Sequence, residues 1–152
     1  MILDKDLLFT SIDGEAVTSS GGSVDSGGSA DLAFSKEIDL GKAADAVGAN
    51  RLTFYTIVKN GGSMTGNLQV KLQTAAAPVS SGASKSYSDM VLSPVVSVSS
   101  GLKAGDALFA CAVPNGAKQY LRVVATVTAP ADAAISSGTV PSVVAFLTKE
   151  QR

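Results

Sequence analysis

Apolar and polar residues alternate along much of this 152-residue chain. The alternation is clearest in segments 67–73 and 121–127, where every second residue is apolar. The two apolar faces consist of Leu68, Val70, Leu72, Leu121, Val123, Ala125 and Val127. A period of two is typical of half-buried antiparallel strands, because successive side chains of a strand point to opposite faces. We therefore expect both segments to be strands that turn these seven residues toward the core.

Five further segments have strand-like composition, and clusters of Gly, Pro, Asn and Ser separate them. These predicted strands span residues 34–40, 52–59, 90–98, 107–113 and 142–148. The alanine-rich segment 41–50 is long enough for one short helical turn and no more. The chain is therefore predicted to be all-β, a jelly-roll-like antiparallel β-sandwich with long Gly/Ser loops.

Two of the predicted strands carry apolar residues on the face opposite their core face. Tyr55 and Ile57 occupy this second face in segment 52–59, and Tyr120 and Val124 flank Arg122 in the other strand. Aromatic and branched residues on a second face are explained if another sheet edge or another chain covers them. We take these five residues as candidates for contact with a partner or with a second copy. For Arg122 the alternative is a guanidinium that lies over the sheet with its head in water.

Two glycine-containing turns are predicted to close hairpins. Asn60-Gly61-Gly62 follows one predicted strand, and Asn115-Gly116 lies between two others. Both turns offer the positive backbone φ angles that tight hairpins demand.

Two segments rich in Gly, Ser and Ala are predicted to be loops. Residues 18–30 contain almost nothing to bury, and residues 75–86 have a similar composition. Such a loop costs backbone entropy to order, so we expect the 18–30 segment to be flexible. The alternative for both segments is ordering against a neighbour, since long loops in compact domains are often functional.

The length and composition fit a single domain over residues 1–152, with 45% hydrophobic and only 16% charged residues. So small a fraction of charged residues favours a surface that another molecule partly covers. The net charge is -1 and the twelve basic residues are scattered, which disfavours direct binding to nucleic acid or to an anionic membrane. No signal peptide and no run of 18 apolar residues is visible, so a cytoplasm-like compartment is expected.

The side chains that most enzymes require are scarce. The chain has no histidine, which removes the usual general base and the commonest zinc ligand. Cys111 is the single cysteine and is expected to be a small buried residue of a strand. An Asp25-Ser26-Gly27 triplet occurs once, in a Gly/Ser loop, and the remaining aspartates lack the spacing of a calcium loop. We therefore expect no enzymatic activity, no cofactor and no bound metal.

Segment 106–127 consists of two strand-like runs joined by a tight Pro-Asn-Gly turn. It resembles the capsid cement, or head decoration, proteins of tailed bacteriophages, in which a strand runs into a Pro-x-Gly turn and then into a Tyr-Leu-Arg strand. The matching residues are Pro114, Gly116, Tyr120, Leu121 and Arg122. The similarity extends in the same order to residues 1–9, 38–41 and 68–74, whereas 18–33 and 76–105 have no counterpart.

This resemblance implies a function. Proteins similar to this one bind the outer surface of an icosahedral capsid at joints between major capsid subunits and stabilise the shell, commonly as jelly-roll dimers. We therefore expect a structural protein of the virion, assembled in the host cytoplasm, whose partners are the major capsid protein and a second copy. The alternative for the same fold is a carbohydrate-binding or adhesive module, although only 5% of the residues are aromatic.

Overall fold

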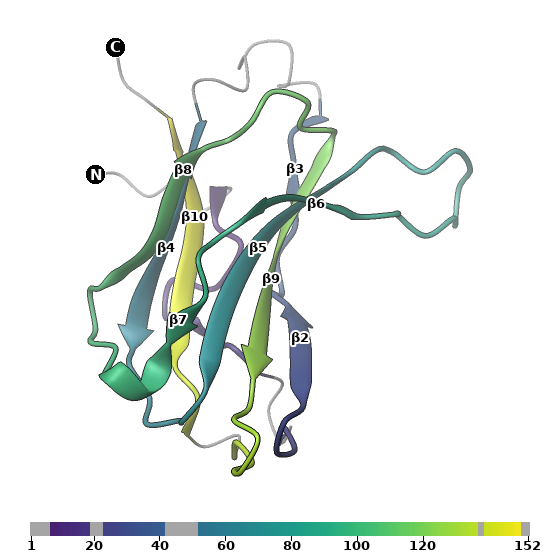
Figure 1. Ribbon diagram of the computed structural model, residues 1–152. Coiled ribbons are helices and arrows are strands. Elements are labelled where there is room, and N and C mark those ends of the chain that lie inside the picture. The colour runs from purple at the N-terminus through teal and green to yellow at the C-terminus, as the bar shows by residue number, and fades with distance from the viewer. Residues whose placement is uncertain (1–6, 19–22, 42–51, 137–138, 150–152) are drawn as a thin grey trace.

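Two antiparallel β-sheets pack face to face in the computed structural model, which describes residues 7–18, 23–41, 52–136 and 139–149 (Figure 1). The four-stranded sheet has the order β1 (Glu15–Ala16), β10 (Ser142–Lys149), β4 (Leu52–Asn60) and β8 (Ala107–Ala112). The main path of the second sheet is β2 (Ser29–Ala33), β9 (Tyr120–Thr128), β5 (Asn67–Ala75) and β6 (Ser88–Leu92). Two short strands complete it, β3 (Ile38–Asp39) beside β9 and β7 (Val96–Ser97) beside β5. The expectation of an all-β antiparallel sandwich is confirmed.

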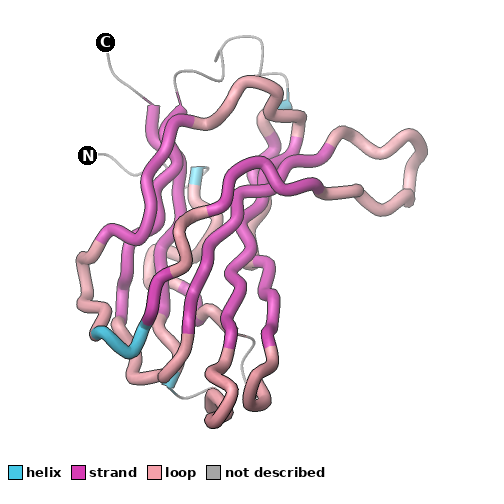
Figure 2. Tube along the Cα trace, viewed as in Figure 1, coloured by secondary structure: helices cyan, strands magenta, loops and turns pink. Residues whose placement is uncertain are grey.

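Strands and loops make up nearly all of the described chain (Figure 2). The helical content that this part shows consists of short turns, such as the 3-10 helix η4 (Val98–Ser100) after β7. The expected helical turn at 41–50 lies outside the described residues, apart from Gly41.

The core lies between the sheets and contains all seven residues that the alternation selected. In β5 and β9 these side chains are at most 1% exposed, because the two strands pair in register and turn the same face inward. The inward positions of β4 are buried as well, with Phe54 packed edge-on against Phe9 at a centroid distance of 5.8 Å. The predicted faces of these three strands are thus confirmed.

The two predicted hairpins are wrong, although their glycines adopt the expected backbone. Gly62 has φ +64° and Gly116 has φ +99°. However, β4 and β5 lie in different sheets, and so do β8 and β9. Each turn therefore carries the chain across the sandwich, because a turn signal specifies a local reversal but not the pairing partner. Gly61 is needed for another reason, since a Cβ there would lie 1.8 Å from the Leu102 carbonyl oxygen.

Two of the predicted strands are interrupted. In segment 34–40 only residues 38 and 39 form a strand, β3. The pairing with β9 begins earlier in the chain, through β2, which starts at Ser29. Segment 90–98 divides into β6 and β7 around Pro94, which has no N–H to donate to a ladder. The other five predicted strands agree with the structure to within two residues at each end.

The described part of the 18–30 segment is ordered against the chain's own residues. Val24 is only 4% exposed and exchanges two backbone hydrogen bonds with Ile135, at 2.9 and 2.8 Å. Gly27 donates to the Pro130 carbonyl, and the segment then enters β2. The expectation that this segment buries almost nothing is therefore wrong. By contrast, residues 76–87 form a loop that projects away from both sheets (Figure 1).

Candidate functional site

The five candidate contact residues lie on opposite outer faces of the sandwich. Tyr55 and Ile57 are on the outer face of the four-stranded sheet, while Tyr120, Arg122 and Val124 are on the outer face of the other sheet. They therefore form two separate surfaces, and the two surfaces differ in chemistry.

The outer face of the four-stranded sheet is apolar. Tyr55 of β4 stacks on Phe146 of β10 with a centroid distance of 5.6 Å and an interplanar angle of 14°. Leu8 forms a β-bridge with Phe146 and both are buried. Ile57 lies next to Val144 across the same strand pair, and both are half-buried. We call this surface the apolar face; its accessible residues are Tyr55, Ile57, Ala110, Ala112 and Val144, and Leu8 and Phe146 are buried beside them.

None of the residues of the apolar face carries a charge, and their outward neighbours Thr53 and Thr148 are neutral too. The charged residue of β4 is Lys59, which is exposed near the strand's end. An uncharged sheet face with half-buried aromatic and branched side chains is typical of a surface that a protein partner covers.

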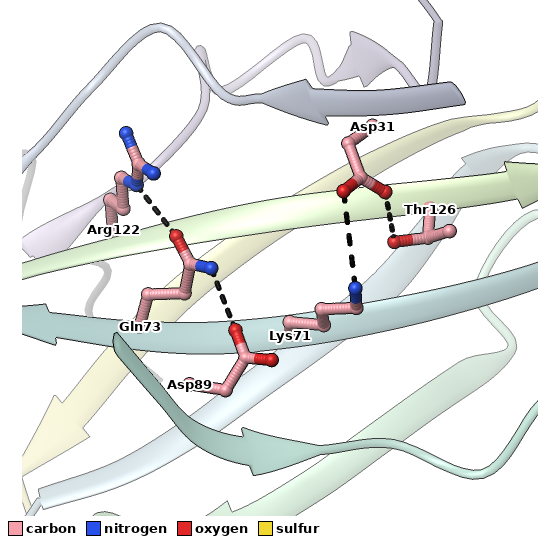
Figure 3. Close-up of polar contacts among 6 residues, drawn as sticks. All are labelled: Asp31, Lys71, Gln73, Asp89, Arg122 and Thr126. Carbon is pink, nitrogen blue, oxygen red and sulfur yellow. Dashed lines mark hydrogen bonds and ion pairs between the residues drawn. The ribbon is translucent and has the colours of Figure 1, made fainter. Parts of the chain in front are cut away.

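The outer face of the second sheet carries a polar network that crosses four strands (Figure 3). Arg122 donates from Nε to Gln73 Oε1 at 2.8 Å, and Gln73 donates from Nε2 to Asp89 Oδ1 at 2.7 Å. Farther along the face, Thr126 donates to Asp31 at 2.5 Å, and Lys71 lies 4.0 Å from the same carboxylate. The chain's own side chains thus satisfy much of the hydrogen-bonding capacity of this face.

Val124 lies in the middle of this polar face but is only 5% exposed. In the strand register it is flanked by Ala33 of β2 and Lys71 of β5. Val124 is thus already covered within one chain and is not available as a contact residue. Sequence alternation placed it on the correct face but could not show this cover.

Contacts between two cations and two aromatic rings attach the projecting loop, residues 76–87, to the second sheet. Lys85 Nζ lies 3.8 Å from the ring centroid of Tyr120 and donates to Glu37 Oε1. The Arg122 guanidinium carbon lies 3.8 Å from the ring centroid of Tyr87. The hydrogen bond that Lys85 donates to Glu37 raises the pKa of Lys85, while burial acts in the opposite direction. Arg122 is half-buried, and its head contacts both Gln73 and Tyr87 while it lines the open cleft beside this loop.

Sequence reasoning missed Glu37 and Lys85, and it considered Tyr87 only as a possible stacking residue of a carbohydrate-binding module. Lys85 and Tyr87 stand in a Ser/Ala/Gly-rich run, and Glu37 is separated from Lys85 by 48 positions. No local pattern brings such residues together. The single usable signal was the grouping of a lysine and a tyrosine in an otherwise featureless loop.

An open cleft of about 460 Å³ lies between this loop and the start of β3. Its polar lining residues are Ser35, Glu37, Ser84, Lys85, Tyr87 and Arg122. The Tyr87 hydroxyl oxygen is buried and has no hydrogen-bond partner. The cleft thus has one carboxylate and two cations in its lining, while the hydroxyl oxygen of Tyr87 is not accessible from it.

Within the described residues, no three His, Cys, Asp or Glu side chains are close enough to hold a metal ion. Asp4 and Asp6 lie outside these residues. Cys111 is half-buried on the inner side of β8, and its burial raises the pKa of the thiol. Over the same part of the chain, the structure contains no helix that could cross a membrane.

The chain matches no family model, and it matches no curated protein in sequence.

Proposed function

We propose that this protein is a capsid cement protein that binds the outer surface of an icosahedral phage shell at joints between major capsid subunits. The observation that carries the proposal is the Pro-Asn-Gly turn followed by Tyr120-Leu121-Arg122, with its resemblance to that family. The structure supports it by supplying a surface suited to a protein partner, the uncharged apolar face.

The mechanism is physical. Each copy covers a seam between capsid subunits, so a modest free energy per copy is summed over the shell and opposes its expansion. The apolar face contributes through burial of Tyr55, Ile57 and Val144, since about 25 cal/mol is gained per Å² of apolar surface removed from water. Its aromatic residues are the side chains most often found at the centres of protein interfaces.

The proposal includes a homodimer, a jelly-roll connectivity and a location on the virion surface. What supports the jelly roll is the strand order, in which early strands pair with late ones in both sheets, as β1 does with β10 and β2 with β9. What supports self-association is the low charge of the four-stranded sheet, because a two-fold contact brings the same patch of both copies together, where charges of one sign would repel.

The test uses empty shells assembled from the major capsid protein encoded in the same genome. The purified protein should sediment with these shells through a gradient and delay their rupture on heating. Ile57→Lys should lower shell binding at least about tenfold, since it places a charge in the covered surface. The matched control is Val95→Lys, which introduces the same charge at an exposed branched residue between β6 and β7.

Two outcomes contradict the proposal. One is recovery of the protein only at the top of the gradient, with shell rupture unchanged. The other is equal loss of shell binding in Ile57→Lys and Val95→Lys, which would show that the apolar face is not the contact surface.

The alternative is a carbohydrate-binding or adhesive module, for which the cleft beside Tyr87 supplies a location. Sugars commonly stack on aromatic faces. Here Lys85 already covers one face of Tyr120, and Arg122 covers one face of Tyr87. Because one face of each ring is already covered, this arrangement favours the cement protein over the carbohydrate-binding module. If the protein bound to a glycan array and Tyr87→Ala abolished that binding, the carbohydrate-binding module would be favoured instead.

A further inference from the structure

β8 is an unprotected sheet edge. Within the described residues it pairs with β4 alone, so its other side meets no strand. Natural edge strands are usually short or carry charged residues that prevent pairing with another chain. The other outer strands follow this rule: β1, β3 and β7 have two residues each, β2 carries exposed Asp31 and β6 carries exposed Asp89. In contrast, β8 has six residues without a charge or a proline.

The free side of β8 presents the backbone groups of two alanines. Val113 donates its N–H to the Leu52 carbonyl at 2.8 Å, so its backbone faces β4. Because successive residues of a strand face opposite edges, Cys111 also faces β4, whereas Ala110 and Ala112 face away. Both alanines are exposed, and their methyl groups do not obstruct an approaching strand.

The stretch available for pairing has two limits and a defined centre. At one end, the register between β4 and β8 shifts before Phe109, which marks a bulge. At the other end, Pro114 has no N–H to donate. The regular stretch is therefore 109–113, and its midpoint is Cys111.

We propose that a second copy of this chain pairs with β8 in an antiparallel, two-fold arrangement centred on Cys111. Ala110 then lies opposite Ala112 of the partner subunit, and Ala112 lies opposite Ala110 of the partner subunit. Each of these two pairs exchanges two backbone hydrogen bonds. Cys111 faces Cys111 of the partner subunit as a non-hydrogen-bonded pair, with Cα atoms about 4.5 Å apart.

The charge pattern selects a second copy over an unrelated chain. In this register the residues next to the two-fold axis, 110–112, lie close to their own copies, where like charges would destabilise pairing. Residues 107–117 contain no charge at all, so two copies of this stretch can pair without bringing any like charges together. The arrangement also joins two four-stranded sheets into one, so the apolar face continues from Tyr55 of one copy across Ala110 and Ala112 into the next.

This inference deepens the self-association in the proposed function and is tested in solution without shells. The measurement is the mass of the purified protein by sedimentation equilibrium over a concentration series. The wild type should have twice the monomer mass. Ala110→Pro removes an outward N–H, and Ala112→Lys places a cation opposite Ala110 of the partner subunit and diagonally across the two-fold axis from its own copy. Each substitution should raise the dimer dissociation constant at least about tenfold.

The matched control is Ala16→Lys, which introduces the same charge at an exposed alanine on the opposite edge of the same sheet. It should leave the dimer intact. Circular dichroism melts of all variants establish that they are folded. Because Ala112 is exposed and its side chain points away from the core, Ala112→Lys keeps the test valid even if Ala110→Pro does not fold.

Mild oxidation supplies a second measurement that reports the register. Cα atoms about 4.5 Å apart fall within the range that a disulfide spans. Covalent dimers should therefore form in the wild type and not in Cys111→Ser or Ala112→Lys. A wild type that remains monomeric at every concentration overturns the proposal, as does a dimer that Ala112→Lys leaves unchanged. A dimer that yields no disulfide overturns the register centred on Cys111.

Failure here is distinguishable from failure of the cement function. A monomeric protein that still sediments with shells would remove the β8 contact and leave shell binding in place. A dimer that does not sediment with shells would leave the β8 contact in place and contradict shell binding.

Discussion

Arg122 and Val123 are neighbours in β9, yet they serve different layers of the molecule. Val123 is fully buried in the core, opposite Leu72 of β5. Arg122 points outward, where it contacts Gln73 and Tyr87. A single strand therefore stabilises the sandwich with one side chain and positions the projecting loop with the next.

Val123→Asp should destabilise the protein strongly, because it buries an unpaired carboxylate at a site with no exposure. We expect a loss of about 3–5 kcal/mol in the free energy of unfolding. The measurement is urea denaturation followed by circular dichroism. The matched control is Thr128→Asp, since Thr128 is on the outer face of the same strand and should change the midpoint little. Equal midpoints in the two variants would show that Val123 is not a core residue.

At the scale of elements, the loop at 76–87 combines a long excursion with a defined attachment. Much of its length is exposed, and Val79 is completely so. Its return is held by Lys85 on Tyr120 and Glu37 and by Tyr87 under Arg122. The contacts of Lys85 and Tyr87 thus fix the base of the loop against the second sheet.

Arg122→Ala should loosen this base, because it removes the cation over Tyr87 and the hydrogen bond to Gln73. An exposed cation–π contact is worth about 0.5–1 kcal/mol, which corresponds to cleavage of the loop about 2- to 5-fold faster. The measurement is the initial rate of tryptic cleavage after Lys85. Thr126→Ala is the control, since it loses a hydrogen bond to Asp31 on the same face without touching the loop. An unchanged rate in Arg122→Ala would mean that Lys85 alone anchors the loop.

At the scale of the molecule, the two sheets share one core. Side chains from both sheets belong to a single buried cluster. The turns at Gly62 and Gly116 each carry the chain from one sheet to the other. Neither sheet can be exposed to water without uncovering the other. We therefore expect a single cooperative unfolding transition.

Tyrosine fluorescence can test this cooperativity sheet by sheet, because the chain has three tyrosines and no tryptophan. Tyr55→Phe leaves Tyr87 and Tyr120 as reporters of the second sheet and its loop. The double variant Tyr87→Phe with Tyr120→Phe leaves Tyr55 as reporter of the four-stranded sheet. Both variants should show fluorescence transitions that coincide with their own circular dichroism transitions in urea. Separate midpoints within one variant would show that the sheets unfold independently.

By itself, the sequence determined the five long strands β4, β5, β8, β9 and β10 and which side of the clearest of them faces inward. Leu68, Val70, Leu72, Leu121 and Val123 are buried as their alternation predicts. This success has a local cause: side-chain direction alternates within any strand, so a period of two in polarity reports the buried face without knowledge of the partner.

Tertiary structure decided which strands pair and what becomes of the residues on the outer faces. Gly62 and Gly116 set local turns, but the strands that they join are in different sheets because pairing partners come from distant parts of the chain. Val24 is buried only because Ile135 lies across from it, and Arg122 is held only because the loop brings Tyr87 over the sheet. Such contacts depend on segments separated by tens of residues, and no local pattern of polarity encodes them.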